Sequence, residues 1–273
     1  MSTLNNHTLL YDDECMLCNI YTSGFISAKM LDKNGRKPFH KVSKKEEEYV
    51  NVSRAANEIA LVNNENKSVT YGIDSLLKVI GYTYPWMAKI GNLNIINYLL
   101  KKLYSFISYN RKVIVPSTKD NTEALTCVPD FNLKYRILYI LFAVSITSSA
   151  LFYFSILIKA LPAANFSREF ALAVGQIAFQ AIFLIGRSKE EITNYSGHIM
   201  TVSVFGSLGL FQILILNSII DFPQTLLLFS FSGIMAFMFL EHRRRVALLG
   251  LPKYLTYTWV LYRILALVII LNI

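Results

Sequence analysis

The sequence predicts an α/β domain at the amino-terminal end, followed by an all-α bundle of about five transmembrane helices. Residues 1–132 hold sixteen Lys/Arg and thirteen Asp/Glu, an ordinary soluble mixture, whereas residues 133–273 hold eleven and five, almost all between long apolar runs. Strand-like and helix-like patterns also alternate in the first part. We therefore expect a domain over residues 1–115, a linker over residues 116–132 and a membrane domain over residues 133–273.

Five apolar segments follow one another in the second part, at residues 137–158, 170–186, 199–220, 222–240 and 254–273. A helix of about 20 apolar residues crosses the roughly 30 Å of hydrocarbon in a bilayer. The second segment is the shortest of the five and contains two glutamines. Five such segments in succession favour spans in a lipid bilayer over the buried helices of a large soluble core.

Basic residues in the short loops predict the orientation of these spans, because cytoplasmic loops carry an excess of Lys and Arg. If the amino-terminal domain is cytosolic, eight basic residues lie on the inner face and two on the outer face. The inner residues are Lys134, Arg136, Arg187, Lys189, Arg243, Arg244, Arg245 and Lys253, and the outer ones are Lys159 and Arg168. The first residues also lack the pattern of a cleavable signal peptide. We therefore expect a protein of the cytoplasmic (inner) membrane with its amino-terminal domain in the cytosol.

Few polar residues interrupt the predicted spans, and these are candidates for a functional interior. They are Gln176, Gln180, Gln212, Asn217, Glu241, His242 and Arg263. In one interpretation the glutamines make hydrogen bonds between helices and the charged residues mark the inner interface. In the other, Arg263 faces the interior of the bundle and pairs with an acid or a ligand.

The order of elements predicted in the first 115 residues is compatible with a thioredoxin-like domain. Residues 7–12 and 37–43 have the pattern of strands, residues 15–31 and 73–80 that of helices, and residues 58–62 and 68–71 flank a turn-forming Asn-Asn-Glu-Asn. Residues 92–108 are apolar but contain two lysines. This segment is either a helix at the membrane surface or a helix that packs on the sheet.

Cys15 and Cys18 form a Cys-x-x-Cys motif where the first strand passes into the first helix. Thiols at this spacing can form a disulfide, and the positive end of the helix dipole favours the thiolate of the first cysteine. We expect Cys15, as the more exposed thiol, to attack and Cys18 to resolve. The acids Asp12, Asp13 and Glu14 oppose thiolate formation, so a strongly lowered pKa is not expected.

Two other interpretations of the cysteine pair remain open. A structural zinc site needs four ligands, and because the chain has no second Cys-x-x-Cys, His7 and His40 would have to complete it. The pair could also be inert core packing. The redox interpretation, which needs neither a metal nor a cofactor, is favoured. The third cysteine, Cys127, lies in the predicted linker and is either incidental or a further thiol for exchange.

Three stretches of the sequence resemble the DCC family of thiol-disulfide oxidoreductases, which is named for an Asp-x-x-Cys-x-x-Cys motif. They begin at Leu10 (LYDDECMLCN), at Thr70 (TYGIDSLL) and at Leu103 (LYSFISYNR). The resemblance implies a thioredoxin-like fold over about residues 7–115 and site residues Asp12, Cys15 and Cys18. Asp13 departs from the family pattern, which usually has glycine at that position.

Two functions are compatible with this sequence. The first is a membrane-anchored thiol-disulfide oxidoreductase that acts on the thiols or disulfides of a protein partner. The second is a non-catalytic accessory subunit that binds other membrane subunits. The net charge of +9 does not indicate a nucleic-acid partner, because the excess lies mainly in loops beside apolar segments.

Overall fold

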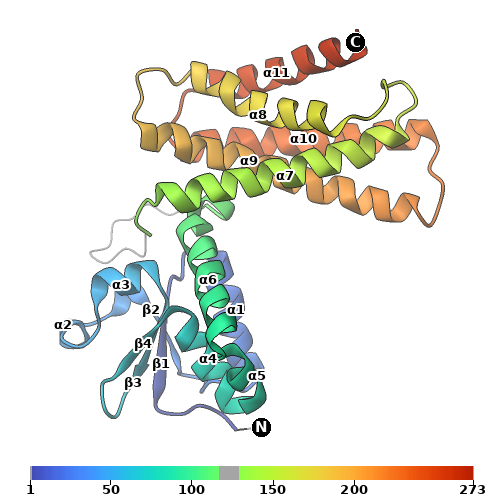
Figure 1. Ribbon diagram of the computed structural model, residues 1–273. Coiled ribbons are helices and arrows are strands. Elements are labelled where there is room, and N and C mark those ends of the chain that lie inside the picture. Colours follow the sequence, from blue (N-terminus) through green and yellow to red (C-terminus); the bar gives the residue numbers. More distant parts are fainter. Residues whose placement is uncertain (1, 117–128, 273) are drawn as a thin grey trace. The chain divides into compact units, whose positions relative to one another are not determined.

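The computed structural model describes residues 2–116 and 129–272 and divides into two compact units, Met1–Tyr135 and Arg136–Ile273 (Figure 1). The predicted linker lies largely outside the described residues, as does Cys127. Each unit has its own hydrophobic core.

A mixed four-stranded sheet forms the centre of the first unit, with strand order β2-β1-β3-β4. Strand β1 (His7–Tyr11) pairs in parallel with β2 (Arg36–Pro38) and antiparallel with β3 (Ala60–Asn63). The predicted hairpin is confirmed, since β3 pairs antiparallel with β4 (Val69–Tyr71). The sheet and its helices confirm the prediction of a thioredoxin-like α/β domain.

Alternating side chains of β1 divide the core into two layers, because successive residues of a strand point to opposite faces of a sheet. Leu9 and Tyr11 belong to a cluster that also contains Cys15 and Cys18 of the motif. Leu10 belongs to a second cluster on the other face.

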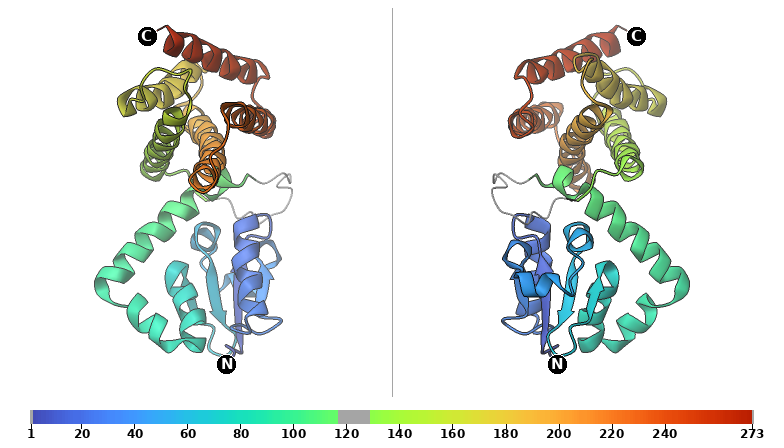
Figure 2. Two further views of the ribbon diagram at one scale, coloured as in Figure 1. Left: turned by 90° about the vertical axis from the view of Figure 1, so that its right-hand side faces the viewer. Right: turned by 90° about the vertical axis from the view of Figure 1, so that its left-hand side faces the viewer.

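Helices cover both faces of this sheet (Figures 1 and 2). The cysteine-bearing cluster includes side chains from α1 (Met16–Ser27), α4 (Gly72–Thr83) and α6 (Asn94–Ile114). The opposite cluster includes side chains from a 3-10 turn (Phe39–Lys41) and from α3 (Val52–Asn57). Helix α6 thus packs on the sheet through Tyr104, although Ile95, Leu99 and Leu103 on its other side are exposed.

The structure corrects two predicted elements and adds three short helices. The strand expected over residues 37–43 ends at Pro38, because Phe39 turns into the core at the start of the 3-10 turn. The first helix is shorter than residues 15–31. Helices α2 (Lys44–Glu47), α3 and α5 (Pro85–Gly91) were not predicted.

Long helices make up the second unit (Figure 1). They are α7 (Leu133–Leu157), which begins just inside the first unit, α8 (Phe166–Ile182), α9 (Lys189–Asn217), α10 (Gln224–Leu248) and α11 (Tyr254–Leu271). Within the described residues, α7, α9, α10 and α11 are long and apolar enough to cross a membrane, which is consistent with an integral membrane protein.

Helix α8 departs from the prediction of about five spans. It has 17 residues, so at 1.5 Å per residue it measures about 25 Å, less than the roughly 30 Å of a hydrocarbon core. Its amino-terminal turn also carries the charged residues Arg168 and Glu169. Four candidate spans are therefore shown, and the expected crossing at residues 170–186 is not among them.

Candidate functional site

Cys15 and Cys18 lie where β1 passes into α1, as the sequence predicted. The backbone N–H of Cys15 donates a hydrogen bond to the Asp12 carbonyl oxygen at 3.2 Å, which closes the turn after the strand. Cys15 is the N-cap residue of α1, and its carbonyl oxygen accepts the N–H of Asn19 at 3.0 Å. The sulfur of Cys15 is therefore held at the positive end of the helix.

Both thiols are buried, which corrects the expectation that Cys15 is the more exposed. Cys15 is 1% exposed and Cys18 is 6% exposed. Both belong to the cluster of β1, α1 and α6 side chains described above. A partner's sulfur can therefore reach Cys15 only after a local displacement of the covering residues.

The two cysteines have opposite pKa shifts. A hydrogen bond from the Cys18 thiol is the largest cause that lowers the pKa of Cys15, from 9.0 to about 6. The Cys18 backbone N–H and the charge of Arg111 act in the same direction, whereas burial and the charge of Asp12 oppose them. The expectation that the nearby acids prevent a strongly lowered pKa is wrong. The same thiol-to-thiol hydrogen bond, together with burial, raises the pKa of Cys18.

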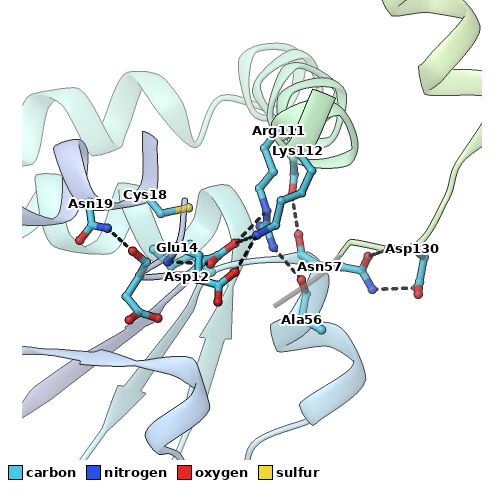
Figure 3. Close-up of polar contacts among 12 residues, drawn as sticks. Asp12, Glu14, Cys18, Asn19, Ala56, Asn57, Arg111, Lys112 and Asp130 are labelled. Atoms are coloured by element: carbon cyan, nitrogen blue, oxygen red, sulfur yellow. Dashed lines mark hydrogen bonds and ion pairs between the residues drawn. The ribbon is translucent and has the colours of Figure 1, made fainter. Parts of the chain in front are cut away.

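Asp12 is buried beside the cysteines and lies in a cluster of charges from two distant parts of the chain (Figure 3). Its Oδ1 accepts the backbone N–H of Glu14 at 3.1 Å. Its Oδ2 lies 3.6 Å from Arg111 Nε and 3.3 Å from Lys112 Nζ, and both of these residues come from α6. Arg111 also donates from Nη2 to the Ala56 carbonyl oxygen at 2.9 Å. These contacts fix the end of α6 against the start of the cysteine motif.

Asp13, which departs from the DCC pattern, has ordinary backbone geometry. It is not one of the described residues with a positive φ, so its backbone conformation does not require glycine. Its carbonyl oxygen accepts a hydrogen bond from Asn19 Nδ2 at 2.6 Å, and its Oδ1 lies 3.0 Å from His40 Nδ1.

Tyr21 and Arg111 are site residues that we did not assign from the sequence. The Tyr21 hydroxyl donates to the Cys18 sulfur at 3.6 Å, and this hydrogen bond favours the Cys18 thiolate. Tyr21 lies one helical turn after Cys18, so its position beside Cys18 could have been predicted from the sequence spacing. Arg111 stands at the end of the third DCC-like stretch, but its contact with Asp12 joins residues far apart in the chain.

The histidines required for a zinc site lie in other hydrogen bonds. His7 Nδ1 is 2.7 Å from the Asn5 carbonyl oxygen, and His40 pairs with Asp13. Over residues 2–116 and 129–272, no group of three or more His, Cys, Asp or Glu side chains is placed to hold a metal ion.

Residues 9–115 match a family model described as DCC1-like thiol-disulfide oxidoreductase. This segment is a DCC1-like domain. The match confirms the family resemblance and reaches from β1 to the end of α6, so the DCC1-like domain contains both the cysteines and Arg111. No curated protein and no solved structure matches the chain.

The second DCC-like stretch has a conformational role in the DCC1-like domain. Its Gly72 begins α4 with a φ of +62°, a region that side chains with a Cβ rarely adopt. A Cβ there would also lie 3.0 Å from Glu58 Oε2. Glycine at this position therefore lets the chain turn from β4 into α4.

The family match ends before the helices of the second unit. In these helices the predicted polar candidates do not form a single group. Gln176 accepts Arg263 Nε at 3.1 Å, and Gln180 Nε2 donates to the Leu255 carbonyl oxygen at 3.4 Å. The glutamines of α8 thus make hydrogen bonds to α11, as one interpretation predicted. His242 stacks on Trp259, which we did not select, at 5.2 Å between ring centroids.

The remaining polar candidates take no part in these hydrogen bonds between α8 and α11. Glu241 pairs with Arg244 and Arg245 of its own helix, at 2.7 Å in each case. Gln212 is exposed, and Asn217 Oδ1 accepts the backbone N–H of Phe222 at the end of α9.

Proposed function

We propose that this protein is a membrane-anchored thiol-disulfide oxidoreductase in which Cys15 attacks and Cys18 resolves. The observation that carries the proposal is the place of Cys15 at the N-terminus of α1, where a hydrogen bond from the Cys18 thiol lowers the pKa of Cys15. At neutral pH this pair holds one thiolate and one proton, the state that a dithiol needs for nucleophilic attack.

The proposed reaction reduces a disulfide of a protein partner. The Cys15 thiolate attacks one partner sulfur, which forms a mixed disulfide and releases the other partner sulfur as a thiolate. Cys18 then loses its proton and attacks Cys15, which forms the Cys15–Cys18 disulfide and releases the second partner thiolate. Two electrons pass to the partner, which leaves as a dithiol, and a second dithiol protein must reduce the domain again.

Formation of the mixed disulfide removes two causes that hold the proton on Cys18. The hydrogen bond to Cys15 and the repulsion from its charge both raise the pKa of Cys18, and both disappear when Cys15 becomes neutral. Arg111 and Tyr21 still favour the Cys18 thiolate. The resolving step is thus activated by the first step.

Asp12 has a positioning role in this proposal. Its own charge raises the pKa of Cys15, so it does not activate the thiol directly. Its carboxylate instead holds Arg111 and Lys112 at the site through ion pairs at 3.6 and 3.3 Å. The net effect is that the charge of Arg111, which favours the thiolate of both cysteines, is held at the site.

A Cys18→Ser variant tests the enzyme proposal, because it can form but cannot resolve the mixed disulfide. Expressed in native membranes, it should accumulate a protein adduct that is cleaved by dithiothreitol and contains Cys15. The Cys15→Ser, Cys18→Ser double variant is the matched control and should give no adduct. Equal adducts in both variants would show capture through another thiol and would contradict the proposal.

We also propose the predicted orientation, with the DCC1-like domain in the cytosol, where partners are reduced rather than oxidised. Buried thiols make poor topology probes, so the test uses single cysteines at exposed positions in a cysteine-free chain. A membrane-impermeant maleimide should label a cysteine at Lys159 in intact cells and should label one at Asn66 only after lysis. The opposite pattern would reverse the orientation.

The burial of both thiols favours a second candidate, a non-catalytic accessory subunit of a membrane complex. In that case the cysteines are core residues and Cys15→Ser should retain function in cells. If the enzyme proposal holds, Cys15→Ser abolishes function at unchanged protein level and membrane insertion. An unimpaired Cys15→Ser, Cys18→Ser variant would favour the subunit.

A further inference from the structure

The second unit, Arg136–Ile273, which is called the membrane unit below, contains a cavity of about 710 Å³ that no step of the proposed reaction uses. Its walls are mainly apolar side chains of α7, α8, α10 and α11, among them Leu151, Phe154, Leu228, Phe231 and Leu267. Cavities of about 300–1,000 Å³ with apolar walls and a few convergent polar groups are typical of small-molecule sites.

Three side chains with hydrogen-bond donors, Arg263, Gln176 and Trp259, line this cavity. Arg263 of α11 donates from Nε to Gln176 Oε1 of α8 at 3.1 Å, and its guanidinium carbon lies 4.7 Å from the centre of the Trp259 ring. Trp259 in turn stacks on His242 of α10. Arg263 is thus held by contacts with two neighbouring side chains, both of which also line the cavity.

Two of these groups lack an acceptor. Gln176 is 3% exposed and Trp259 is 1% exposed, yet Gln176 Nε2 and Trp259 Nε1 have no hydrogen-bond partner in the part of the chain that the structure describes. If the oxygen and nitrogen of the Gln176 amide were exchanged, two donors would face each other, the Gln176 N–H and Arg263 Nε. The orientation in which Gln176 Oε1 accepts from Arg263 is therefore the favourable one, and it leaves Nε2 without an acceptor. A buried polar group without a partner costs about 1–3 kcal/mol. The site therefore lacks an acceptor that a ligand can supply.

Arg263 also lacks a counter-charge. Among the described acidic residues, none lies within ion-pair distance of Arg263: Glu169 is engaged by Arg168 at 2.6 Å, and Glu241 pairs with arginines of α10. Ionisable residues inside membrane bundles almost always pair, and they mark binding sites or ion pathways. Because the Arg168–Glu169 pair at the cavity wall is already neutralised, Arg263 is the positive charge that remains available.

We propose that this cavity binds an amphiphile with an anionic, oxygen-bearing head group. The carboxylate or phosphate accepts hydrogen bonds from Arg263, Gln176 Nε2 and Trp259 Nε1, and the hydrocarbon tail lies along the apolar walls. A free fatty acid and an anionic phospholipid share this chemistry. A neutral molecule with the same tail satisfies the donors less well, because it leaves the buried charge of Arg263 uncompensated.

Trp259 provides the test, because the chain has two tryptophans and a Trp86→Phe variant leaves Trp259 as the sole one. This full-length variant is placed in phosphatidylcholine nanodiscs and titrated with dibromostearate, whose bromines quench nearby tryptophan. Quenching should be saturable and should be reversed by unbrominated stearate. Dibromostearyl alcohol should need at least a tenfold higher concentration. This comparison uses a single protein and does not depend on the folding of further variants.

Two substitutions in the same background locate the site. Arg263→Met should weaken the apparent affinity for dibromostearate at least tenfold, whereas Arg243→Met, which removes an exposed positive charge, should change it less than twofold. A brominated phosphatidylglycerol tested in parallel identifies the source of the head group. Saturable quenching by that lipid but not by the fatty acid assigns a phospholipid, and the reverse assigns a fatty acid. Equal affinity for the acid and the alcohol, or no saturable quenching by any anionic probe, would overturn the proposal.

Discussion

Removal of Arg111 should destabilise the DCC1-like domain through the buried carboxylate that it leaves behind. Arg111 and Asp12 have side chains that are 6% and 3% exposed and lie 3.6 Å apart. At an effective dielectric constant of about 20, two unit charges at this distance attract by about 4–5 kcal/mol. Arg111→Met also leaves the Ala56 carbonyl oxygen without its bond from Nη2.

Two effects reduce that magnitude. Lys112 Nζ remains 3.3 Å from Asp12. In addition, folding of the variant no longer has to remove water from a charged guanidinium at position 111. Breaking a buried ion pair costs about 3–5 kcal/mol, so we expect about 3 kcal/mol. With a urea dependence of about 2 kcal/mol per M, the unfolding midpoint should fall by about 1.5 M.

The assay is pulsed alkylation of Cys18 at increasing urea concentrations. The protein is the full-length chain with Cys127→Ser, and the label on the Cys18 peptide is measured by mass spectrometry. Burial and a raised pKa protect Cys18 in the folded domain, so its labelling follows unfolding of this domain without interference from the membrane helices. Lys112→Met is the matched control. Its side chain is 22% exposed, and its loss should cost about 1 kcal/mol or less.

The double variant Asp12→Asn, Arg111→Met is a second control, since it removes the buried carboxylate together with Arg111. It should recover most of the stability that Arg111→Met loses. If Arg111→Met is no more harmful than Lys112→Met, or if the double variant is as unstable as Arg111→Met, the reasoning from a buried charge pair is refuted.

Two further outcomes follow from the described contacts. The alkylation rate of Cys15 should rise with a midpoint near pH 6, because its pKa is lowered to about 6 and the thiolate is lost below that pH. A midpoint near pH 9 would contradict this expectation. Gly206→Ala should reduce the thermal stability of the membrane unit by about 1–3 kcal/mol, because its Cβ would clash with the Met238 sulfur. Gly233→Ala meets nothing within 4 Å among the described residues and should be neutral in the same melting experiment.

Local patterns in the sequence were sufficient for much of this architecture. The alternation in β1, the turn between β3 and β4 and the position of the cysteines at a strand-to-helix junction all depend on near neighbours in the chain. The long apolar helices are likewise set by composition. The hydrogen bonds of Gln176 and Gln180 were predicted because amides in apolar helices need partners.

The missed features depend on contacts that local patterns do not contain. The three acids before Cys15 suggested an ordinary thiol, but the Cys18 hydrogen bond and Arg111 outweigh Asp12. The burial of Cys15 results from packing by β1, α1 and α6 together. In the sequence Trp259 is one more apolar residue of a predicted span, although its ring contacts both His242 and Arg263.

The contact between Asp12 and Arg111 also has a consequence for synthesis on the ribosome. The two residues are separated by most of the DCC1-like domain, and about 100 residues take roughly 5–20 s to translate. During that interval the nascent chain carries both cysteines without α6, which later packs against them and supplies the cations. The thiols are thus most accessible to oxidants and to modification before the first membrane helix has been made.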